Sequence, residues 1–381
     1  MKTSQISAIA QELLSVFEMA DLKRKKVSQE ETIKVSEAMS SVAFLYEKIR
    51  NVIDYREEHL FRIGAIERSL QRRPLWKNKE KEVAESLIRE LIRSGYLENQ
   101  RVPVIKINQV SQIISKYRSL FRALTSENQK NEKLIDWVLS LAASEIEIVL
   151  VPQEEEKALM VAFYQLLKKN INYNGYPEKT TKTRFYIASQ RALLKPSLPT
   201  LRYNLLLGYL PEWPEAKPEK INYFATNIIQ IKEKIEAHLN HPQTEKLVHY
   251  CRRHTAPFLI LKDVIGQSPL ETRGEFQDPE KLEERVIEVC QRRYSQAKSR
   301  LTRGATRSII YIFLTKMLFA LFLEFPFDLW VVHRVKLFPL AINSIFPPAL
   351  MFAFVLSVPK PGEKNTQRII EKIKEIVYQG T

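Results

Sequence analysis

Two long apolar runs near the C-terminal end constrain this chain more than any other feature. Residues 308–332 read SIIYIFLTKMLFALFLEFPFDLWVV, and residues 337–358 read LFPLAINSIFPPALMFAFVLSV. The second run carries no charged residue. As a helix it would be about 33 Å long, which matches a hydrocarbon core of about 30 Å. We therefore predict a two-helix transmembrane hairpin over 308–358. The alternatives are a buried helical pair in a soluble core and a re-entrant segment.

The second run contains three prolines, Pro339, Pro347 and Pro348. Proline breaks an isolated helix, but membrane helices tolerate it where neighbouring groups satisfy the carbonyls that lose their donors. We expect a kink at Pro347–Pro348. Asn343 lies one turn earlier, where it would hydrogen-bond the freed backbone or the partner helix.

The first run differs from the second because it contains Lys316, Glu324 and Asp328. A charge near the bilayer centre costs about 2.5–3.5 kcal/mol on insertion scales. Lys316 and Asp328 lie close enough to the two ends of the run to reach opposite interfaces, whereas Glu324 would need a polar partner on the second helix. All three are candidate functional charges in the membrane, and Glu324, together with Lys316, is the candidate for a proton or ion path. The alternative for Glu324 is a position at the far interface, beside Pro326.

A basic stretch precedes the first run. It contains no acidic residue between Val289 and Arg307 but has six basic ones: Arg292, Arg293, Lys298, Arg300, Arg303 and Arg307. Beside an anionic leaflet each contributes about 1 kcal/mol, so we expect them to contact anionic lipid headgroups. Nucleic acid is the less favoured partner, because Tyr294 is the only aromatic residue among them. Basic residues on both outer flanks of the hairpin predict that both termini are cytoplasmic.

Composition agrees with an anionic surface as partner, since the net charge is +15 and the pI is near 9.5. The two cysteines make no disulfide framework, and the N-terminal residues lack the continuous apolar segment of a signal peptide. The nine glycines are spaced too widely for a G-x-G-x-x-G, P-loop or G-x-S-x-G motif. The sequence therefore favours a protein that is not an enzyme.

Helical periodicity dominates the rest of the chain. One long helix is predicted at about 28–73, beginning at a capping box formed by Ser28 and Glu31. Only the segment 146–151, IEIVLV, has strand character. A second strong helix start is Asp278, followed by proline at the first helical position.

These signals divide the chain into five parts. They are an N-terminal helical domain (1–151), a second helical subdomain with proline-rich connections (152–272), a basic juxtamembrane helix (278–307), the hairpin (308–358) and a basic amphipathic tail (359–381).

Four of the six histidines and one cysteine lie close together in the sequence: His238, His241, His249, Cys251 and His254. His238 and His241 share a helix face, as do Cys251 and His254, so a helical hairpin at Pro242 would gather ligands for tetrahedral zinc. The spacing matches no established zinc motif, and Arg252 and Arg253 would repel a cation. The alternative is a set of polar positions beside a turn between helices.

The sequence thus predicts an all-α protein, with a multi-helix cytoplasmic region followed by a C-terminal two-helix transmembrane hairpin. We expect a membrane-anchored scaffold or adaptor that binds an unidentified protein partner and needs no cofactor. One alternative is a subunit of a transport or secretion complex that uses the charged first span. Another is a metal-dependent enzyme, with zinc at His238–His254.

Overall fold

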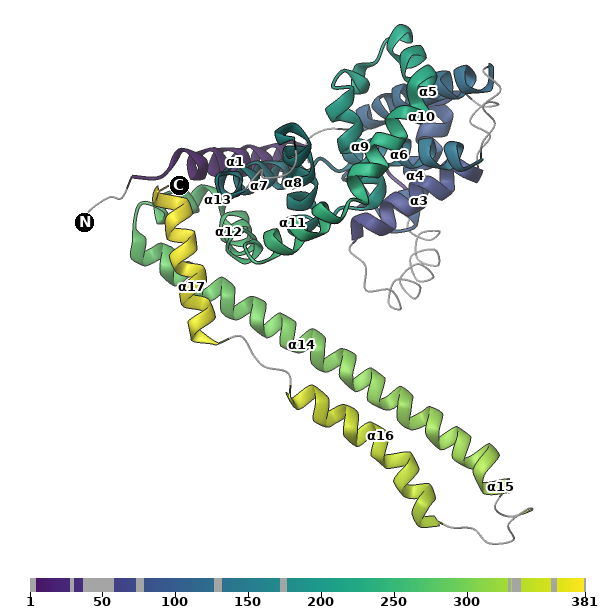
Figure 1. Cartoon of the computed structure of the whole chain (residues 1–381), viewed down its shortest axis with the longest axis vertical. Coiled ribbons are helices and arrows are strands. Elements are labelled where there is room, and N and C mark those ends of the chain that lie inside the picture. The colour runs from purple at the N-terminus through teal and green to yellow at the C-terminus, as the bar shows by residue number, and fades with distance from the viewer. Residues whose placement is uncertain are drawn as a thin grey trace. The chain divides into compact units, whose positions relative to one another are not determined.

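The computed structural model divides the chain into two compact units, Ile6–Arg273 and Gly274–Gln379. It describes all residues except 1–4, 28–30, 37–57, 73–78, 127–131, 172–176, 328–329, 331–336, 358–361 and 380–381, and for a few others, such as Glu324, it describes the backbone alone. Within the described residues every regular element is a helix, and strand-like pairing is limited to one isolated bridge between Thr32 and Pro103 (Figure 1). The predicted all-α class is confirmed.

The first unit consists of short and medium helices. They are α1 (Ala8–Val27), α3 (Glu58–Arg72), α4 (Glu80–Arg93), α5 (Ile105–Ser126), α6 (Glu132–Leu150), α7 (Glu154–Leu167), α8 (Glu178–Leu193), α9 (Leu198–Tyr209), α10 (Pro218–Leu239), α11 (Pro242–Arg252), α12 (Thr255–Gln267) and α13 (Pro269–Glu275), with 3-10 turns at Lys168–Asn170 and Trp213–Glu215.

Helix α6 is the centre of the larger core. It contacts α3, α5 and α9, and α10 packs on α5. Because neighbours cover it on several sides, nearly every residue from Trp137 to Glu147 is buried. This burial explains why 146–151 resembles a strand in sequence although it continues α6 up to Leu150. A helix that is covered all round is apolar all round, and its sequence loses the helical period.

Helices α1, α7, α8, α11 and α12 form the other part of the first unit, where α11 packs on α8 and α1 packs on α7. The acidic first turn of α7 meets the basic end of α1, since Lys23 pairs with Glu154 at 2.7 Å and Arg24 pairs with Glu155 at 2.6 Å. Helices from both sides of Pro152 therefore pack together, and the expected division of this region near Pro152 stays a prediction.

The long helix expected at about 28–73 is wrong over its described beginning. Residues 31–36 are extended, and Ile33 donates its backbone N–H to the carbonyl of Val102 at 2.9 Å. The side chain of Asn99 also bonds both the N–H (3.1 Å) and the carbonyl (2.9 Å) of Val35. These long-range bonds bury Ile33 and Val35, and this burial overrides the local capping signal. Residues 37–57 lie outside the described residues, and α3 supplies the predicted helical end.

The second unit contains α14 (Pro279–Phe319), a π-helical turn (Ala320–Glu324), α15 (Phe325–Phe327), α16 (Leu337–Ser357), α17 (Glu363–Lys374) and a second π-helical turn (Glu375–Gln379). Helix α14 begins as predicted, because Asp278 Oδ1 accepts the N–H of Glu280 at 3.1 Å. The boundary between the two units falls within helix α13, which precedes α14.

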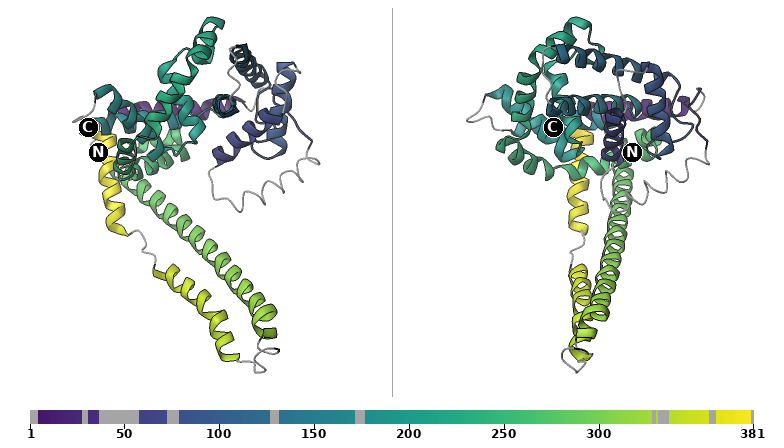
Figure 2. Two further views of the ribbon diagram at one scale, coloured as in Figure 1. Left: turned by 45° about the vertical axis from the view of Figure 1, so that its right-hand side comes forward. Right: turned by 90° about the vertical axis from the view of Figure 1, so that its right-hand side faces the viewer.

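Within the second unit, α16 and α17 both lie along α14 (Figures 1 and 2). α16 runs beside the C-terminal half of α14, and α17 returns to its N-terminal half. There, Lys374 pairs with Glu283 at 2.6 Å, and Asn365 donates to the Tyr294 hydroxyl at 2.9 Å. Within the second unit, the chain thus runs in one direction along α14 and in the opposite direction along α16 and α17.

Candidate functional site

The most unusual surface of the described chain is the apolar arm, which we define as residues 308–327 together with α16. Most of its described large apolar side chains are exposed, with exposed fractions from 41% at Phe313 to 76% at Phe338. The exposed set on α14 and the turn after it is Ile310, Tyr311, Phe313, Leu314, Met317, Leu318, Phe319, Leu321, Phe322 and Leu323; on α16 it is Phe338, Ile342, Ile345, Phe346, Leu350, Phe352 and Phe354. A soluble protein rarely leaves so many apolar side chains in contact with water.

The length and composition of the arm's helices also indicate a membrane environment. Among the described residues, the segment Pro279–Leu323 is long and apolar enough to cross a membrane, and none of its apolar window is buried within the protein. The described apolar part of α16, Ile345–Val355, is shorter than a full span. α16 nevertheless continues through Pro347 and Pro348 from Leu337 to Ser357. Membrane association is thus indicated by one helix, and the two-helix transmembrane hairpin stays a prediction.

The three charged residues predicted in the first run are not brought together in the described structure. Lys316 is half-buried near the end of α14. Glu324 ends the π-helical turn, where its backbone alone is described, and Asp328 lies outside the described residues. A proton or ion path through these residues stays a prediction.

The predicted basic residues occupy different faces of α14. At about 100° per residue, Arg292, Arg300, Arg303 and Arg307 fall within an arc of about 80°. We call these four residues the arginine stripe, and all four are exposed. Arg293 lies at the edge of the same face and is half-buried, whereas exposed Lys298 lies on the opposite side of the helix.

The histidine cluster does not assemble around a common point. His241 is the N-cap of α11, where its Nδ1 accepts the backbone N–H of Gln243 at 3.1 Å. His238 is half-buried on α10, and burial lowers its pKa, as do the nearby charges of Arg184 and His241. A lowered pKa disfavours the imidazolium form.

The other members are engaged separately. The Cys251 thiol is buried 3.8 Å from Ser189 Oγ, and burial raises its pKa to about 11. His249 lies 3.1 Å from Arg253, and His254 precedes α12. Among the described residues, no group of three or more His, Cys, Asp or Glu side chains is arranged to hold a metal ion. The alternative in which these are polar positions beside helix turns fits this geometry better.

A buried ion pair between Lys116 on α5 and Glu145 on α6 was not foreseen from the sequence. Lys116 Nζ also donates to the carbonyls of Trp213 at 2.8 Å and Pro214 at 3.1 Å, and the Trp213 indole donates to the Tyr117 hydroxyl at 3.1 Å. Burial lowers the pKa of Lys116 and raises the pKa of Glu145, although each attracts the other. Desolvation is thus the larger effect on both, and the pair connects α5, α6 and the 213–215 turn inside an apolar core.

This network had one signal in the sequence. Glu145 and Glu147 are charged residues inside a helix that is otherwise strongly apolar, and buried carboxylates need partners. Glu147 has such a partner too, because Arg62 Nη2 lies 3.1 Å from its Oε1. Neither partner is close in sequence, so pattern reading alone could not have named it.

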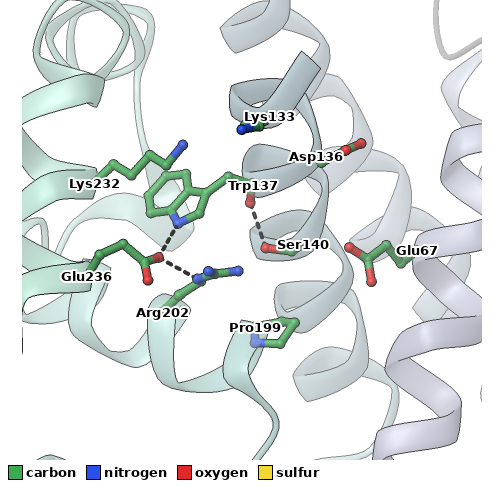
Figure 3. Close-up of a pocket in the computed structure, with 9 residues that line it drawn as sticks. All are labelled: Glu67, Lys133, Asp136, Trp137, Ser140, Pro199, Arg202, Lys232 and Glu236. Atoms are coloured by element: carbon green, nitrogen blue, oxygen red, sulfur yellow. Dashed lines mark hydrogen bonds and ion pairs between the residues drawn. The ribbon is translucent and has the colours of Figure 1, made fainter. Parts of the chain in front are cut away.

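A shallow pocket of about 350 Å³ lies between α3, α6, α9 and α10 (Figure 3). Glu236 Oε1 accepts hydrogen bonds from the Trp137 indole at 2.9 Å and from Arg202 Nε at 2.6 Å. Glu67 lines the other side of the pocket from α3 (Figure 3). Burial and the nearby Asp136 carboxylate raise the pKa of Glu67. The volume of the pocket is near the lower end of the range for ligand sites, and its charges of both signs compensate one another, so it favours no particular ligand class.

No protein-family model, curated protein or solved structure matches this chain. The function must therefore be inferred from the chain's own residues. The apolar arm and the basic surface beside it are the most informative features of the chain.

Proposed function

We propose that this chain is an integral membrane protein that acts as a scaffold or adaptor. In this proposal the apolar arm crosses the bilayer as a hairpin, and the unit Ile6–Arg273 presents a helical surface to a partner protein on the cytoplasmic side. The observation that carries the proposal is the exposure of many large apolar side chains along the C-terminal half of α14 and along α16.

The free energy of burying apolar side chains favours an apolar environment around the arm. Burying a Leu, Ile, Phe or Met side chain contributes about 1.5–3 kcal/mol, and the arm exposes such residues on both helices. Lipid covers all sides of a helical pair at once, as required here, whereas a groove on a protein covers one side. The arm therefore fits a lipid environment better than a protein-binding groove.

The dimensions of the arm also fit a bilayer. The helical stretch from Ser308 to Leu323 is about 24 Å long and α16 is about 31 Å long, against a hydrocarbon core of about 30 Å. The short helix α15 (Phe325–Phe327) follows the π-helical turn and lengthens this helical stretch. The return of α17 to α14 supports a hairpin, because it brings the chain back to the side from which α14 entered.

Carbonate extraction of membranes from cells that express the full chain tests the anchor. We expect the wild-type chain to stay with the membrane pellet. The triple variant Leu314→Arg, Leu318→Arg and Leu321→Arg should be released, because each arginine costs about 2.5–3.5 kcal/mol in the bilayer.

The matched control puts three arginines at exposed apolar positions of the first unit, Tyr223, Ile229 and Leu270. This control should stay in the pellet. Release of the wild-type chain, or equal behaviour of the two triple variants, would contradict the anchor. For the scaffold role, crosslinking in intact cells followed by mild-detergent purification should recover a second protein, and repeated recovery of the bare chain would count against it.

A further inference from the structure

The arginine stripe (Arg292, Arg300, Arg303 and Arg307) faces away from the rest of the second unit. On the opposite side of α14, Tyr294 contacts α17 through Asn365 and Ala305 is buried. These two residues lie about 160–180° around the helix from the middle of the stripe. The stripe is therefore an open face that α17 does not cover.

No ion pair of the stripe is described. Glu288 lies one turn before Arg292, and it pairs with Arg285 at 2.6 Å. The ion pairs described for α14 involve Asp278, Glu283 and Glu288, all of which precede Val289. From Val289 to Arg307 the sequence contains no Asp or Glu. The one side-chain hydrogen bond described for the stripe is local, from Arg303 Nε to the carbonyl of Ser299 at 3.3 Å. Its guanidinium groups are thus available to an outside anion.

Helix geometry limits how much of the stripe lipid can reach. α14 is continuous, so Arg292 lies about 22 Å along the axis from Arg307. If the hydrocarbon core begins at Ser308, the headgroup layer extends only about 5–8 Å beyond it, and electrostatic screening acts over about 8 Å. Arg303 and Arg307 then lie among headgroups, whereas Arg292 lies in water beyond their field, and a helix tilt of about 20° changes this little.

We propose that the membrane-distal part of the arginine stripe, Arg292 and Arg300, binds an acidic, carboxylate-rich segment of a partner protein. This inference rests on the proposed membrane anchor and names the chemistry of the partner. Arginine forms paired, bidentate hydrogen bonds with carboxylates, and the stripe is one side chain wide, which suits a single acidic helix. Single-stranded nucleic acid fits less well, because the nearest aromatic residue, Tyr294, lies on the opposite face and bonds α17.

The test uses the full chain in nanodiscs of neutral lipid and a fluorescent, helical Glu/Ala peptide as the probe. Binding is measured by anisotropy at low and moderate salt. The stripe variant replaces the two membrane-distal arginines, Arg292 and Arg300, with glutamine. The matched control replaces Lys298 and Lys364 with glutamine, which removes the same charge from exposed positions away from the stripe.

We expect the stripe variant to bind the Glu/Ala peptide at least about fivefold more weakly than the wild type, and the control to change affinity less than about twofold. A peptide with Gln in place of Glu should not bind. Equal loss in both variants, or no loss in either, would overturn the proposal, since net charge or another surface would then be responsible.

Two further probes separate other occupants. If the stripe variant instead loses affinity for vesicles of anionic lipid while peptide binding is unchanged, the stripe is a lipid contact. If an oligothymidine probe binds more tightly than the peptide and needs the same arginines, the partner is nucleic acid. Either result overturns the proposal. If carbonate extraction shows that the chain is not anchored while the peptide result holds, the anchor fails but the docking surface stands.

Discussion

His238 is a titratable residue of the first unit from which a pH effect on stability is expected near neutral pH. Its pKa in the folded chain lies below the ordinary value of 6.5, because of burial first and then the charges of Arg184 and His241. The unfolded chain therefore binds a proton at a higher pH than the folded chain does. It follows that the free energy of unfolding decreases as the pH falls through about 6.5 toward the lowered pKa.

Urea unfolding of the full chain in detergent, at about pH 7.5 and about pH 5.5, measures this effect. Acidification should destabilise the wild-type chain more than the variant His238→Gln, which has no imidazole to protonate. His249→Gln is the control, because His249 is exposed on the neighbouring helix and should retain the wild-type pH dependence. An identical response of wild type and His238→Gln would show that this imidazole does not contribute.

The residues that were predicted least well are those whose partners are distant in sequence. Lys116 and Glu145 are 29 positions apart, and although Glu145 stands out in its apolar helix, Lys116 looks like an ordinary polar residue. Nothing in a helical period identifies which lysine meets which glutamate in a core. The opposite failure affects the histidines, where closeness in sequence suggested a zinc site but each side chain is positioned by a different local contact.

At the scale of elements, the docking of α17 onto α14 offers a direct test. The Tyr294 hydroxyl accepts from Asn365 at 2.9 Å and lies 3.3 Å from the Thr366 hydroxyl. Tyr294→Phe removes both hydrogen bonds and should weaken the docking by about 1 kcal/mol. We expect faster hydrogen–deuterium exchange in α17, with α4 and α6 unchanged.

Tyr311→Phe on the same helix is the control for this change, since its ring is 71% exposed and no hydrogen bond of its hydroxyl is described. It should leave exchange in α17 at the wild-type rate. If Tyr294→Phe also leaves that rate unchanged, apolar packing of Ile369, Ile370 and Ile373 holds α17 in place without the hydroxyl.

Element boundaries were predictable where a local cap determines them. Gly95 has a φ of 73° just after α4, a conformation typical of a helix end, and Asp278 caps α14 as predicted. The start at Ser28–Glu31 failed because residues 31–36 bond to residues 99–104, and no local signal reveals such a long-range pairing. Capping motifs thus predicted the boundaries of elements whose ends make no distant contacts.

At the scale of the whole chain, the return of α17 to α14 predicts the topology of a membrane-inserted arm. Peptide tags at the two ends of the full chain should be digested by protease from the same side of sealed vesicles. A cysteine introduced at Val332, between the two apolar helices, should react with a membrane-impermeant maleimide only from the other side. Protection of one end tag alone would indicate a single span instead of a hairpin.

The fold class was predictable because helical periodicity runs through most of the sequence, and the apolar arm was predictable because its composition is extreme. The packing of helices from both sides of Pro152 was not, since it depends on which apolar faces match in space. The positions of the basic residues on two faces of α14 could also be predicted from the sequence, once α14 is taken as one continuous helix.

That continuity has a mechanical consequence. A hydrogen-bonded helix bends gently but resists twisting about its axis. The apolar half of α14 and the half that carries Tyr294 therefore rotate together as one rigid element. A neighbour that turned the apolar half about its axis would swing the arginine stripe through the same angle and pull Tyr294 away from α17. Rotation at one end of this helix is thereby converted into a change of exposed charge at the other, with no hinge between them.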